Sequence, residues 1–377
     1  MKAVIAGYAR SPFHFANKGL LAQVRPDDLA SQVVKALLAH TDLDPALLED
    51  VILGCAYPEA SQGNNLARIV GLLSGLPQDV GGMTVNRFCG SSMSAVHIAA
   101  ANIEAGLGDA FLCVGVESMT QVPQGGFNFS PNPWLQEYTD AYVSMGRTAE
   151  NVAERYAIPR GEQERMALES HQKAADAREQ GRLRDEIVRI QTGTGEWITE
   201  DGCIRPNTSL DALAKLPPAF DENGVVTAGT SSPLTDGASA VLVTSDDFAA
   251  RHNLKPSARI RAVASAGCDP AVMGLGPIPA TQKALARAGL NADDLGVVEI
   301  NEAFASQALA CIGDLNLDPA TVNLDGGGMA IGHPLGATGA RITGKAAALL
   351  QREKVKYALA TQCIGGGQGV ATILEAL

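Results

Sequence analysis

Residues 85–96 read Val85-Asn86-Arg87-Phe88-Cys89-Gly90-Ser91-Ser92-Met93-Ser94-Ala95-Val96. A strand-like end leads into one cysteine, small residues follow, and an apolar helical run comes next. The unpaired N–H groups and the dipole of a helix N-terminus favour a thiolate over a thiol, and they can hold a developing oxyanion. A lone cysteine in such a place is more often a small core residue. The rest of the chain has to decide whether Cys89 is a nucleophile.

The composition predicts a packed protein of two or three domains. The chain has 377 residues, of which 46% are hydrophobic, and one ordinary core rarely holds so many. The net charge is −12 and the sequence has no basic block. Nucleic acid and anionic membrane surfaces are therefore poor partners. No run of 18 apolar residues occurs, so we expect no membrane span.

Seven cysteines are scattered along the chain, at positions 55, 89, 113, 203, 268, 311 and 363. Their number is odd and no CxxC pair occurs, so the pattern favours neither a disulfide framework nor a zinc site. We expect no metal and a reducing, cytoplasmic location. The N-terminus is too short and too soon charged to read as a signal peptide.

Short apolar strands alternate with amphipathic helices toward both ends of the chain, which predicts parallel sheets. The expected strands cover 3–7, 48–55, 110–116, 238–244 and 357–362. The expected helices cover 26–39, 65–73, the run after Cys89 to about 105, 148–156, 160–179 and 336–350.

The two alternating regions resemble each other. Residues 48–55 have a counterpart in 295–302, and the cysteine stretch with its helix and strand has one in 322–362. A repeat of roughly 120 residues predicts two similar α/β halves. A site at their seam would take one loop from the strand ends of each half. Chance similarity among α/β units is the alternative.

The segment between these regions has a different texture. Residues 121–133 are rich in Gly, Pro, Asn and Phe and predict an irregular loop. We therefore expect an N-terminal half over 1–117, a loop domain over 118–246 whose end returns to the N-terminal core, and a C-terminal half over 247–377. The apolar Phe127, Phe129 and Trp134 in this insert predict an oligomer interface.

Three further stretches place polar side chains beside glycine. His333 lies in Gly332-His333-Pro334, and imidazole is the usual base for a thiol, although a lone loop histidine is more often structural. Cys363 ends a strand before Gly365-Gly366-Gly367, where a thiol could move a proton and glycine amides could hold an oxyanion. Asn301 follows an apolar strand and is either a turn former or an uncharged donor.

Together these stretches resemble the thiolase family over nearly the whole chain. Four of them look like the family signatures, in family order: Cys89-Gly90-Ser91-Ser92, Asn301-Glu302-Ala303-Phe304, Gly332-His333-Pro334 and Cys363-Ile364-Gly365-Gly366-Gly367-Gln368-Gly369. The loop Val226-Thr227-Ala228-Gly229-Thr230-Ser231-Ser232 resembles the one that contacts coenzyme A. The resemblance implies a five-layered αβαβα core of two similar halves with an inserted loop domain.

The resemblance also implies a role for each site residue. Cys89 is the nucleophile, His333 takes its proton, and Cys363 is the acid/base at the acetyl α-carbon. Asn301 and His333 stabilise the enolate oxygen, and the amides of Cys89 and Gly365 form the thioester oxyanion hole. The implied contacts with coenzyme A and the acyl chain come from Arg205, Ala228, Ser232, Phe304 and Met145.

The implied activity is thiolytic cleavage of 3-ketoacyl-CoA by CoA, without any cofactor, in fatty-acid β-oxidation. Ser144 stands where thiolases specialised for acetoacetyl-CoA carry histidine, so we expect acyl chains longer than four carbons to fit. Condensation of two acetyl-CoA to acetoacetyl-CoA is the alternative. A decarboxylating ketosynthase usually needs two histidines, and Cys363 holds the place of one. A non-enzymatic acyl-CoA or lipid carrier would not need all four catalytic side chains.

The resemblance finally implies partners. We expect acyl-CoA and CoA as ligands, a homodimer or homotetramer, and a β-oxidation subunit as a candidate partner.

Overall fold

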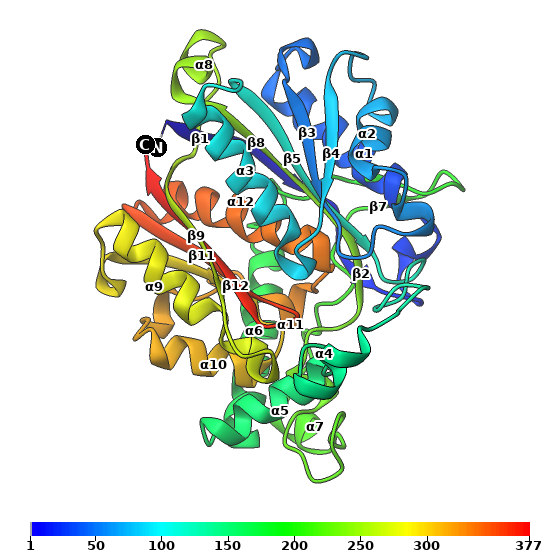
Figure 1. Ribbon diagram of the computed structural model, residues 1–377, viewed down its shortest axis with the longest axis vertical. Helices are drawn as coiled ribbons and strands as arrows, with labels where there is room; N and C mark the ends of the chain where they lie inside the picture. The colour runs from blue at the N-terminus through cyan, green and yellow to red at the C-terminus, as the bar shows by residue number, and fades with distance from the viewer. Residues whose placement is uncertain (1) are drawn as a thin grey trace.

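A computed structural model describes residues 2–377 as a mixed α/β protein (Figure 1). Its strands are β1 (Ala3–Arg10), β2 (His14–Phe15), β3 (Asp50–Gly54), β4 (Gly81–Val85), β5 (Ala110–Ser118), β6 (Ile190–Gln191), β7 (Trp197–Ile198), β8 (Thr235–Ser245), β9 (Ala258–Gly267), β10 (Leu295–Ile300), β11 (Tyr357–Ile364) and β12 (Gln368–Ala376). Its helices are α1 (Pro26–Thr41), α2 (Leu66–Leu73), α3 (Ser91–Ala105), α4 (Pro133–Tyr138), α5 (Met145–Arg155), α6 (Arg160–Glu179), α7 (Leu210–Ala214), α8 (Asp246–Arg251), α9 (Pro277–Ala288), α10 (Ala305–Asp314), α11 (Gly328–Ile331) and α12 (Leu335–Glu353).

The main sheet consists of two halves with the same strand order. It runs β10-β11-β12-β9-β1-β8-β5-β3-β4, and β2 also pairs with β8. In the N-terminal half, β3 lies parallel to β4 on one side and to β5 on the other. In the C-terminal half, β10 lies parallel to β11. On the other side of β10, Val322 makes a single parallel bridge to Val298, in the position that β4 has in the first half. Among residues 2–377, the strands of the two halves are hydrogen-bonded to each other only where Val4 and Ile5 of β1 pair with β9. The repeat expected from the sequence is thus present in the topology.

The elements stack in five layers, which follow one another across Figure 1. Helices α1 and α2 pack on the outer face of the N-terminal half, and α9 and α10 pack on the outer face of the C-terminal half. Helices α3 and α12 lie between the two halves and share one core with strands of both. The order helix, sheet, helix, sheet, helix is the predicted αβαβα arrangement.

The buried position of the middle layer explains its composition. Strands β5 and β8 are buried along their whole length, as expected for strands covered on both faces. Helix α12 carries glycines that let it approach α3. A Cβ built on Gly339 would lie 2.3 Å from the backbone nitrogen of Met93, so a larger residue there would push the two helices apart.

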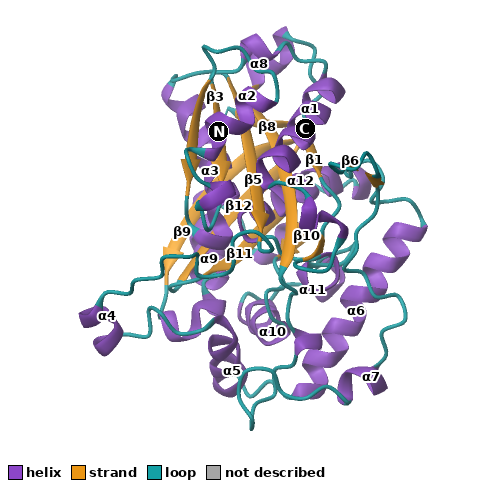
Figure 2. Cartoon of the chain, turned by 90° about the vertical axis from the view of Figure 1, so that its right-hand side faces the viewer, coloured by secondary structure: helices purple, strands orange, loops and turns teal. Residues whose placement is uncertain are grey.

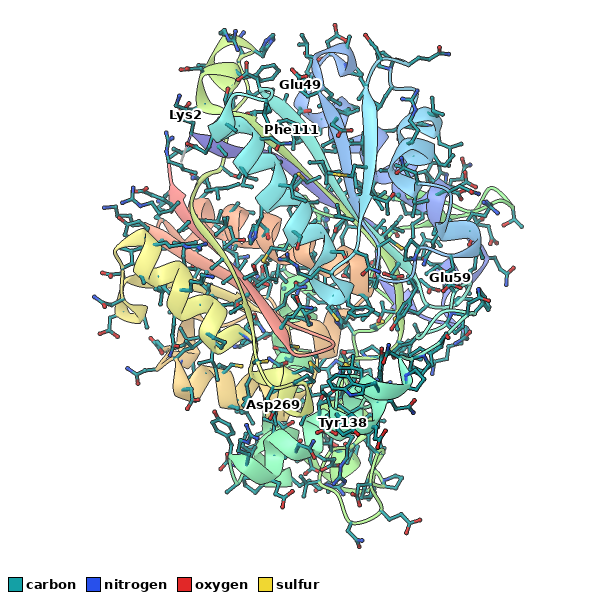
Figure 3. The ribbon with its side chains drawn as sticks, viewed as in Figure 1. Lys2, Glu49, Glu59, Phe111, Tyr138 and Asp269 are labelled. Carbon is teal, nitrogen blue, oxygen red and sulfur yellow. The ribbon has the colours of Figure 1, made fainter. Side chains whose placement is uncertain are left out.

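The loop domain lies at the carboxyl ends of the parallel strands and contains α4 to α7 with the small β6–β7 ribbon. Helix α4 stands away from the body of the molecule (Figure 2). Its preceding loop is held by Glu59, which accepts a hydrogen bond from the backbone of Phe127 at 2.9 Å (Figure 3). The irregular loop predicted over 121–133 has no regular element before α4 begins.

The predicted elements agree with the observed ones to within a few residues. The largest differences are three residues, at the end of β1, the start of β8, the end of α12 and the start of α5. Helix α5 begins at Met145 instead of 148 because Ser144 caps the helix through the backbone N–H of Arg147. Within residues 2–377, no helix is both long enough and apolar enough to cross a membrane.

Candidate active site

The first component of the site is the strained turn that carries Cys89. A short 3₁₀ segment, Phe88–Gly90, joins β4 to α3, and Phe88 has a φ of 43°, which side-chain-bearing residues seldom adopt. The hydroxyl of Ser91 donates to the Phe88 carbonyl at 2.6 Å and accepts from the backbone N–H of Arg87 at 2.8 Å. These bonds hold the turn and leave the half-buried Cys89 at the start of the helix.

The second component is the hairpin between β11 and β12, which brings Cys363 and Gly365 to Cys89. The side-chain amide of Gln362 donates to the Cys89 carbonyl. Burial raises the pKa of the Cys89 thiol to about 12, while the backbone N–H groups of Gly365 and Cys89 lower it. Burial also raises the pKa of Cys363 well above its usual value, and the charge of a Cys89 thiolate adds to this effect.

The raised pKa values argue against the expectation that Cys89 is a thiolate in the free protein. The helix N-terminus and the amides favour the charged sulfur, but the cost of removing it from water is larger. Both thiols are therefore protonated in the free protein, and deprotonation of Cys89 has to accompany attack on a bound substrate.

The third component is His333, which two threonines hold. Gly332 has a φ of 110°, a conformation that favours glycine, and it turns the chain just before the histidine. The backbone N–H of His333 donates to Thr235 Oγ1 at 3.0 Å, and its Nδ1 lies 2.6 Å from Thr338 Oγ1. Burial lowers the pKa of His333 to about 3, with a smaller contribution from Arg341, so the imidazole is neutral at pH 7.

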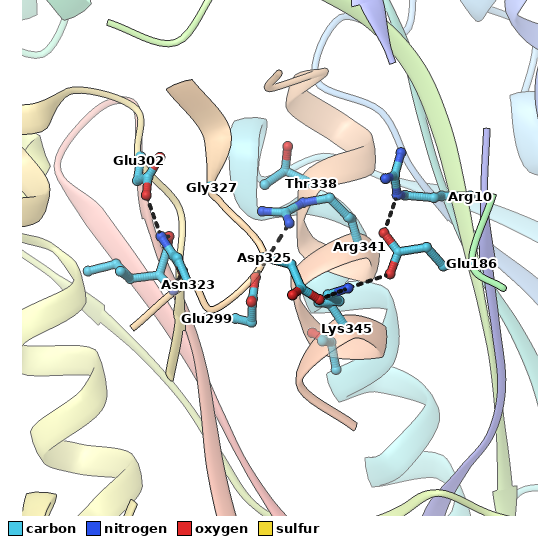
Figure 4. Close-up of polar contacts among 12 residues, drawn as sticks. Arg10, Glu186, Glu299, Glu302, Asn323, Asp325, Gly327, Thr338, Arg341 and Lys345 are labelled. Carbon is cyan, nitrogen blue, oxygen red and sulfur yellow. Dashed lines mark hydrogen bonds and ion pairs between the residues drawn. The ribbon is translucent and has the colours of Figure 1, made fainter. Parts of the chain in front are cut away.

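The fourth component is the loop after β10. The amide Nδ2 of Asn301 lies 3.3 Å from Nε2 of His333, and both side chains are buried. The neighbouring Glu302 accepts hydrogen bonds from Ser170 at 2.6 Å and from Asn323 at 2.7 Å (Figure 4). The loop is therefore fixed from both sides, and Asn301 keeps its amide on the histidine.

Glu117 is a residue that the sequence did not single out. This fully buried carboxylate at the end of β5 accepts backbone hydrogen bonds from Ala56 at 2.8 Å, Tyr57 at 3.1 Å and Gly336 at 2.9 Å. It thereby joins loops of both halves beside the site. An acid at the end of an apolar strand was the available signal, but its partners are distant in sequence.

A buried network of charges lies on α12 after Thr338, which contacts His333 (Figure 4). Arg341 on α12 is 3.4 Å from Glu299, and Lys345 one turn later is 2.9 Å from Glu186 and 2.6 Å from Asp325. Glu186 belongs to the loop domain. The network therefore fixes α12, the helix that follows His333, against that domain.

The residues expected to bind coenzyme A fall into two groups. Ser231 bridges to Phe304, and the backbone N–H of Ser232 donates to the Ala303 carbonyl at 2.9 Å, so the segment with Ala228 and Ser232 lies against Phe304. Arg205 is exposed and lies apart, with its guanidinium 5.1 Å from the centre of the Phe15 ring.

Met145 lies beside Gly365. A Cβ built on Gly365 would be 3.5 Å from its sulfur and 3.7 Å from the ring of Phe88. Ser144, in contrast, is exposed and serves as the cap of α5. That the small Ser144 side chain leaves room for a longer acyl chain stays a prediction.

Metal binding has no evident centre. Within residues 2–377, no group of three or more His, Cys, Asp or Glu side chains is arranged to hold a metal ion.

The fold and the site define an acyltransferase built from two similar α/β halves, with a cysteine at a helix start against the amide of a glycine hairpin and with a buried histidine–asparagine pair. The chain belongs to the thiolase family: residues 3–247 match the model of the thiolase N-terminal domain, and residues 254–376 match that of the C-terminal domain.

Curated proteins that are similar to this chain support its assignment to the thiolase family. The chain is 49% identical to a 3-ketoacyl-CoA thiolase of Saccharophagus degradans, over 99% of this chain and 97% of the relative. It is 46% identical to a protein of the same name from Shewanella denitrificans, over 99% of both chains. The fold is similar to human mitochondrial 3-ketoacyl-CoA thiolase, with a TM-score of 0.92 and 39% identity over 99% of this chain and 98% of that one. A structure of that human enzyme in complex with CoA gives a TM-score of 0.92 at 38% identity, covering 100% of this chain and 98% of the other.

Proposed function

We propose that the protein cleaves 3-ketoacyl-CoA with free coenzyme A to acetyl-CoA and an acyl-CoA shortened by two carbons. One observation carries the proposal: the backbone N–H of Gly365 contacts the Cys89 thiol, and the Cys89 and Cys363 thiols are close enough to interact electrostatically, in a chain whose full-length relatives are named 3-ketoacyl-CoA thiolases. The reaction requires a nucleophile, a proton donor for carbon and an oxyanion site, and this constellation can supply all three.

In the first half-reaction, Cys89 gives its proton to His333 and its sulfur attacks the keto carbon. The bond between that carbon and the α-carbon breaks, its electron pair leaves with acetyl-CoA as an enolate, and the acyl group stays on Cys89 as a thioester. Cys363 donates its proton to the α-carbon, which yields acetyl-CoA. Coenzyme A then attacks the acyl-cysteine, its thiol proton passes to the enzyme, and Cys89 is released.

Two sets of donors match the two negative charges. The backbone N–H groups of Cys89 and Gly365 serve the tetrahedral oxyanion, because both already point at the Cys89 sulfur. Asn301 and His333 serve the enolate oxygen of acetyl-CoA, directly or through water. No metal or redox cofactor enters these steps.

The ligands are acyl-CoA and CoA. A CoA complex of the similar human enzyme supports this assignment. The segment with Ala228 and Ser232, together with Phe304, lines the pantetheine path; Met145 contacts the acyl chain, and Arg205 binds the nucleotide end.

Acetoacetyl-CoA synthesis from two acetyl-CoA uses the same groups in reverse and is the second candidate. Thiolysis kinetics with 3-ketoacyl-CoA substrates of four to sixteen carbons separate the two. We expect a specificity constant that stays high beyond four carbons. A peak at four carbons with at least a tenfold fall by six would move acetoacetyl-CoA to first place.

We also propose a cytoplasmic homo-oligomer, dimer or tetramer, with a β-oxidation subunit as a candidate partner. The support comes from the insert around α4. Phe127, Phe129 and Trp134 are 58%, 64% and 64% exposed, and such a concentration of apolar side chains on a projecting segment favours an interface.

A further inference from the structure

Two threonine hydroxyls contact His333, one at its backbone and one at its ring. Thr235 Oγ1 accepts from the histidine backbone N–H and donates to the Pro233 carbonyl at 2.6 Å. Thr338 Oγ1 lies 2.6 Å from the ring Nδ1 and 3.1 Å from the Pro334 carbonyl, to which it can donate. Thr338 is completely buried on the first turn of α12. One threonine fixes the backbone of His333, and the other meets its ring.

The hydrogen atoms around the ring can be assigned by counting donors. A hydroxyl has one hydrogen, so if Thr338 donates to Pro334 its oxygen must accept, and Nδ1 must carry the ring proton. Nε2 then has a free lone pair, and the group facing it is the amide Nδ2 of Asn301, a donor. The opposite tautomer would set an N–H on Nε2 against the N–H of Asn301 unless the amide were reversed.

We propose that Thr338 is a positioning residue that holds His333 in the tautomer with the proton on Nδ1, leaving Nε2 as the base. This inference rests on the proposed role of His333 in thiolysis. When the Cys89 thiol gives its proton to Nε2, the ring becomes an imidazolium with a hydrogen on each nitrogen. The Nδ1–H still donates to Thr338, so the ring keeps that bond, while the Asn301 amide gives up the Nε2 lone pair to the incoming proton.

Helix α12 offers a matched control. Thr343 is also completely buried and donates to the carbonyl four residues earlier, Gly339, at 2.7 Å. Thr338→Val and Thr343→Val remove the same hydroxyl from the same helix while keeping the side-chain shape. Only the first removes an acceptor from His333. Thr338→Ser keeps that acceptor.

The test measures thiolysis kinetics and the tautomer of His333. We expect Thr338→Val to lower kcat by about 10- to 100-fold with KM changed less than about twofold. Thr338→Ser should recover most of the rate, and Thr343→Val should stay within about twofold of the wild type. The ¹⁵N resonances of the histidine rings, with His333 assigned by its loss in His333→Asn, should show Nδ1 protonated in the wild type and a changed tautomer population in Thr338→Val.

Two results would overturn the inference: equal losses of kcat in Thr338→Val and Thr343→Val, or a wild-type ring protonated on Nε2. Failure of the proposed function itself has a different signature, because the wild type would then show no thiolysis of 3-ketoacyl-CoA, and failure of the base role of His333 would leave thiolysis unchanged in His333→Asn.

Discussion

At the scale of single residues, the site depends on groups that burial keeps neutral. Burial raises the pKa of the Cys89 thiol to about 12 and lowers that of His333 to about 3. Proton transfer between them is therefore unfavourable until the substrate places an electrophile beside the sulfur. The sequence pointed to Cys89, His333, Cys363 and Asn301, since each lies in a short local motif. It did not point to Glu117 and Thr338, whose contacts depend on burial and on the fold.

The first residue-scale prediction concerns the nucleophile. Cys89→Ser should fold and bind CoA but lose at least about a hundredfold in kcat, because serine lacks an accessible low-pKa form and a nucleophilic sulfur. Steady-state thiolysis and calorimetric CoA binding measure the two properties. Cys113→Ser, at a buried cysteine on β5 away from the site, is the control. A Cys89→Ser rate above about a tenth of the wild-type rate would remove Cys89 from its role.

The second concerns the proton donor. Cys363→Ala should block carbon–carbon cleavage far more strongly than acyl exchange between Cys89 and CoA, because only the first step delivers a proton to carbon. Isotope exchange between labelled CoA and acyl-CoA measures the second step alone. Equal losses in both reactions would contradict this division between the two thiols.

At the scale of elements, the site is assembled from corresponding loops of the two halves. The cysteine turn follows β4, Cys363 lies at the end of β11, and His333 precedes α12. The periodicity of strands and helices predicted most element limits. It did not predict the start of α5, because the Ser144 side chain caps the helix through a local hydrogen bond that the spacing of apolar residues does not reveal. Nor did the periodicity predict that the Glu117 carboxylate accepts hydrogen bonds from loops of both halves.

The element-scale prediction is that Glu117→Gln loosens this assembly. The carboxylate accepts three backbone N–H groups, and an amide would turn a donor toward at least one of them. We expect a loss of about 1–3 kcal/mol in the free energy of unfolding together with a lower kcat. Denaturant unfolding and thiolysis assays measure both. Glu137→Gln, at an exposed glutamate on α4, should change neither, and an unaltered Glu117→Gln protein would contradict the role.

At the scale of the whole molecule, two halves enclose a middle layer that buries charges and histidines along with apolar side chains. Burial lowers the pKa of His97 to about 3 and that of His171 to about 4, from an ordinary value of 6.5, with Arg205 adding to the effect on His171. The unfolded chain therefore binds more protons than the folded one below pH 6.5. Their contribution to stability is fully present above pH 6.5 and is lost as the pH falls toward 4.

This predicts a stability that declines on acidification and a variant that declines less. His97→Gln should make the fall between pH 6.5 and pH 4.5 shallower by up to about 1.4 kcal/mol per pH unit. Denaturant unfolding at several pH values measures the slope. His40→Gln, at an exposed position on α1, should leave it unchanged. Equal slopes in all three proteins would contradict the account of the buried ring.

The second whole-molecule prediction concerns assembly. Sedimentation at micromolar concentration should give a mass at least twice the 39.1 kDa of one chain. Trp134→Ala should weaken the assembly, while Trp197→Ala, at the other tryptophan and also exposed, should not. A monomeric wild type would refute the interface.

The most direct test of the central claim is mass spectrometry of the protein mixed with a 3-ketoacyl-CoA in the absence of free CoA. The proposed mechanism predicts that one equivalent of acetyl-CoA is released and that one acyl group, shortened by two carbons, remains on the peptide that contains Cys89. Added CoA should remove that group as acyl-CoA. An acyl group on another residue, or acetyl-CoA formed without any acylated peptide, would contradict it.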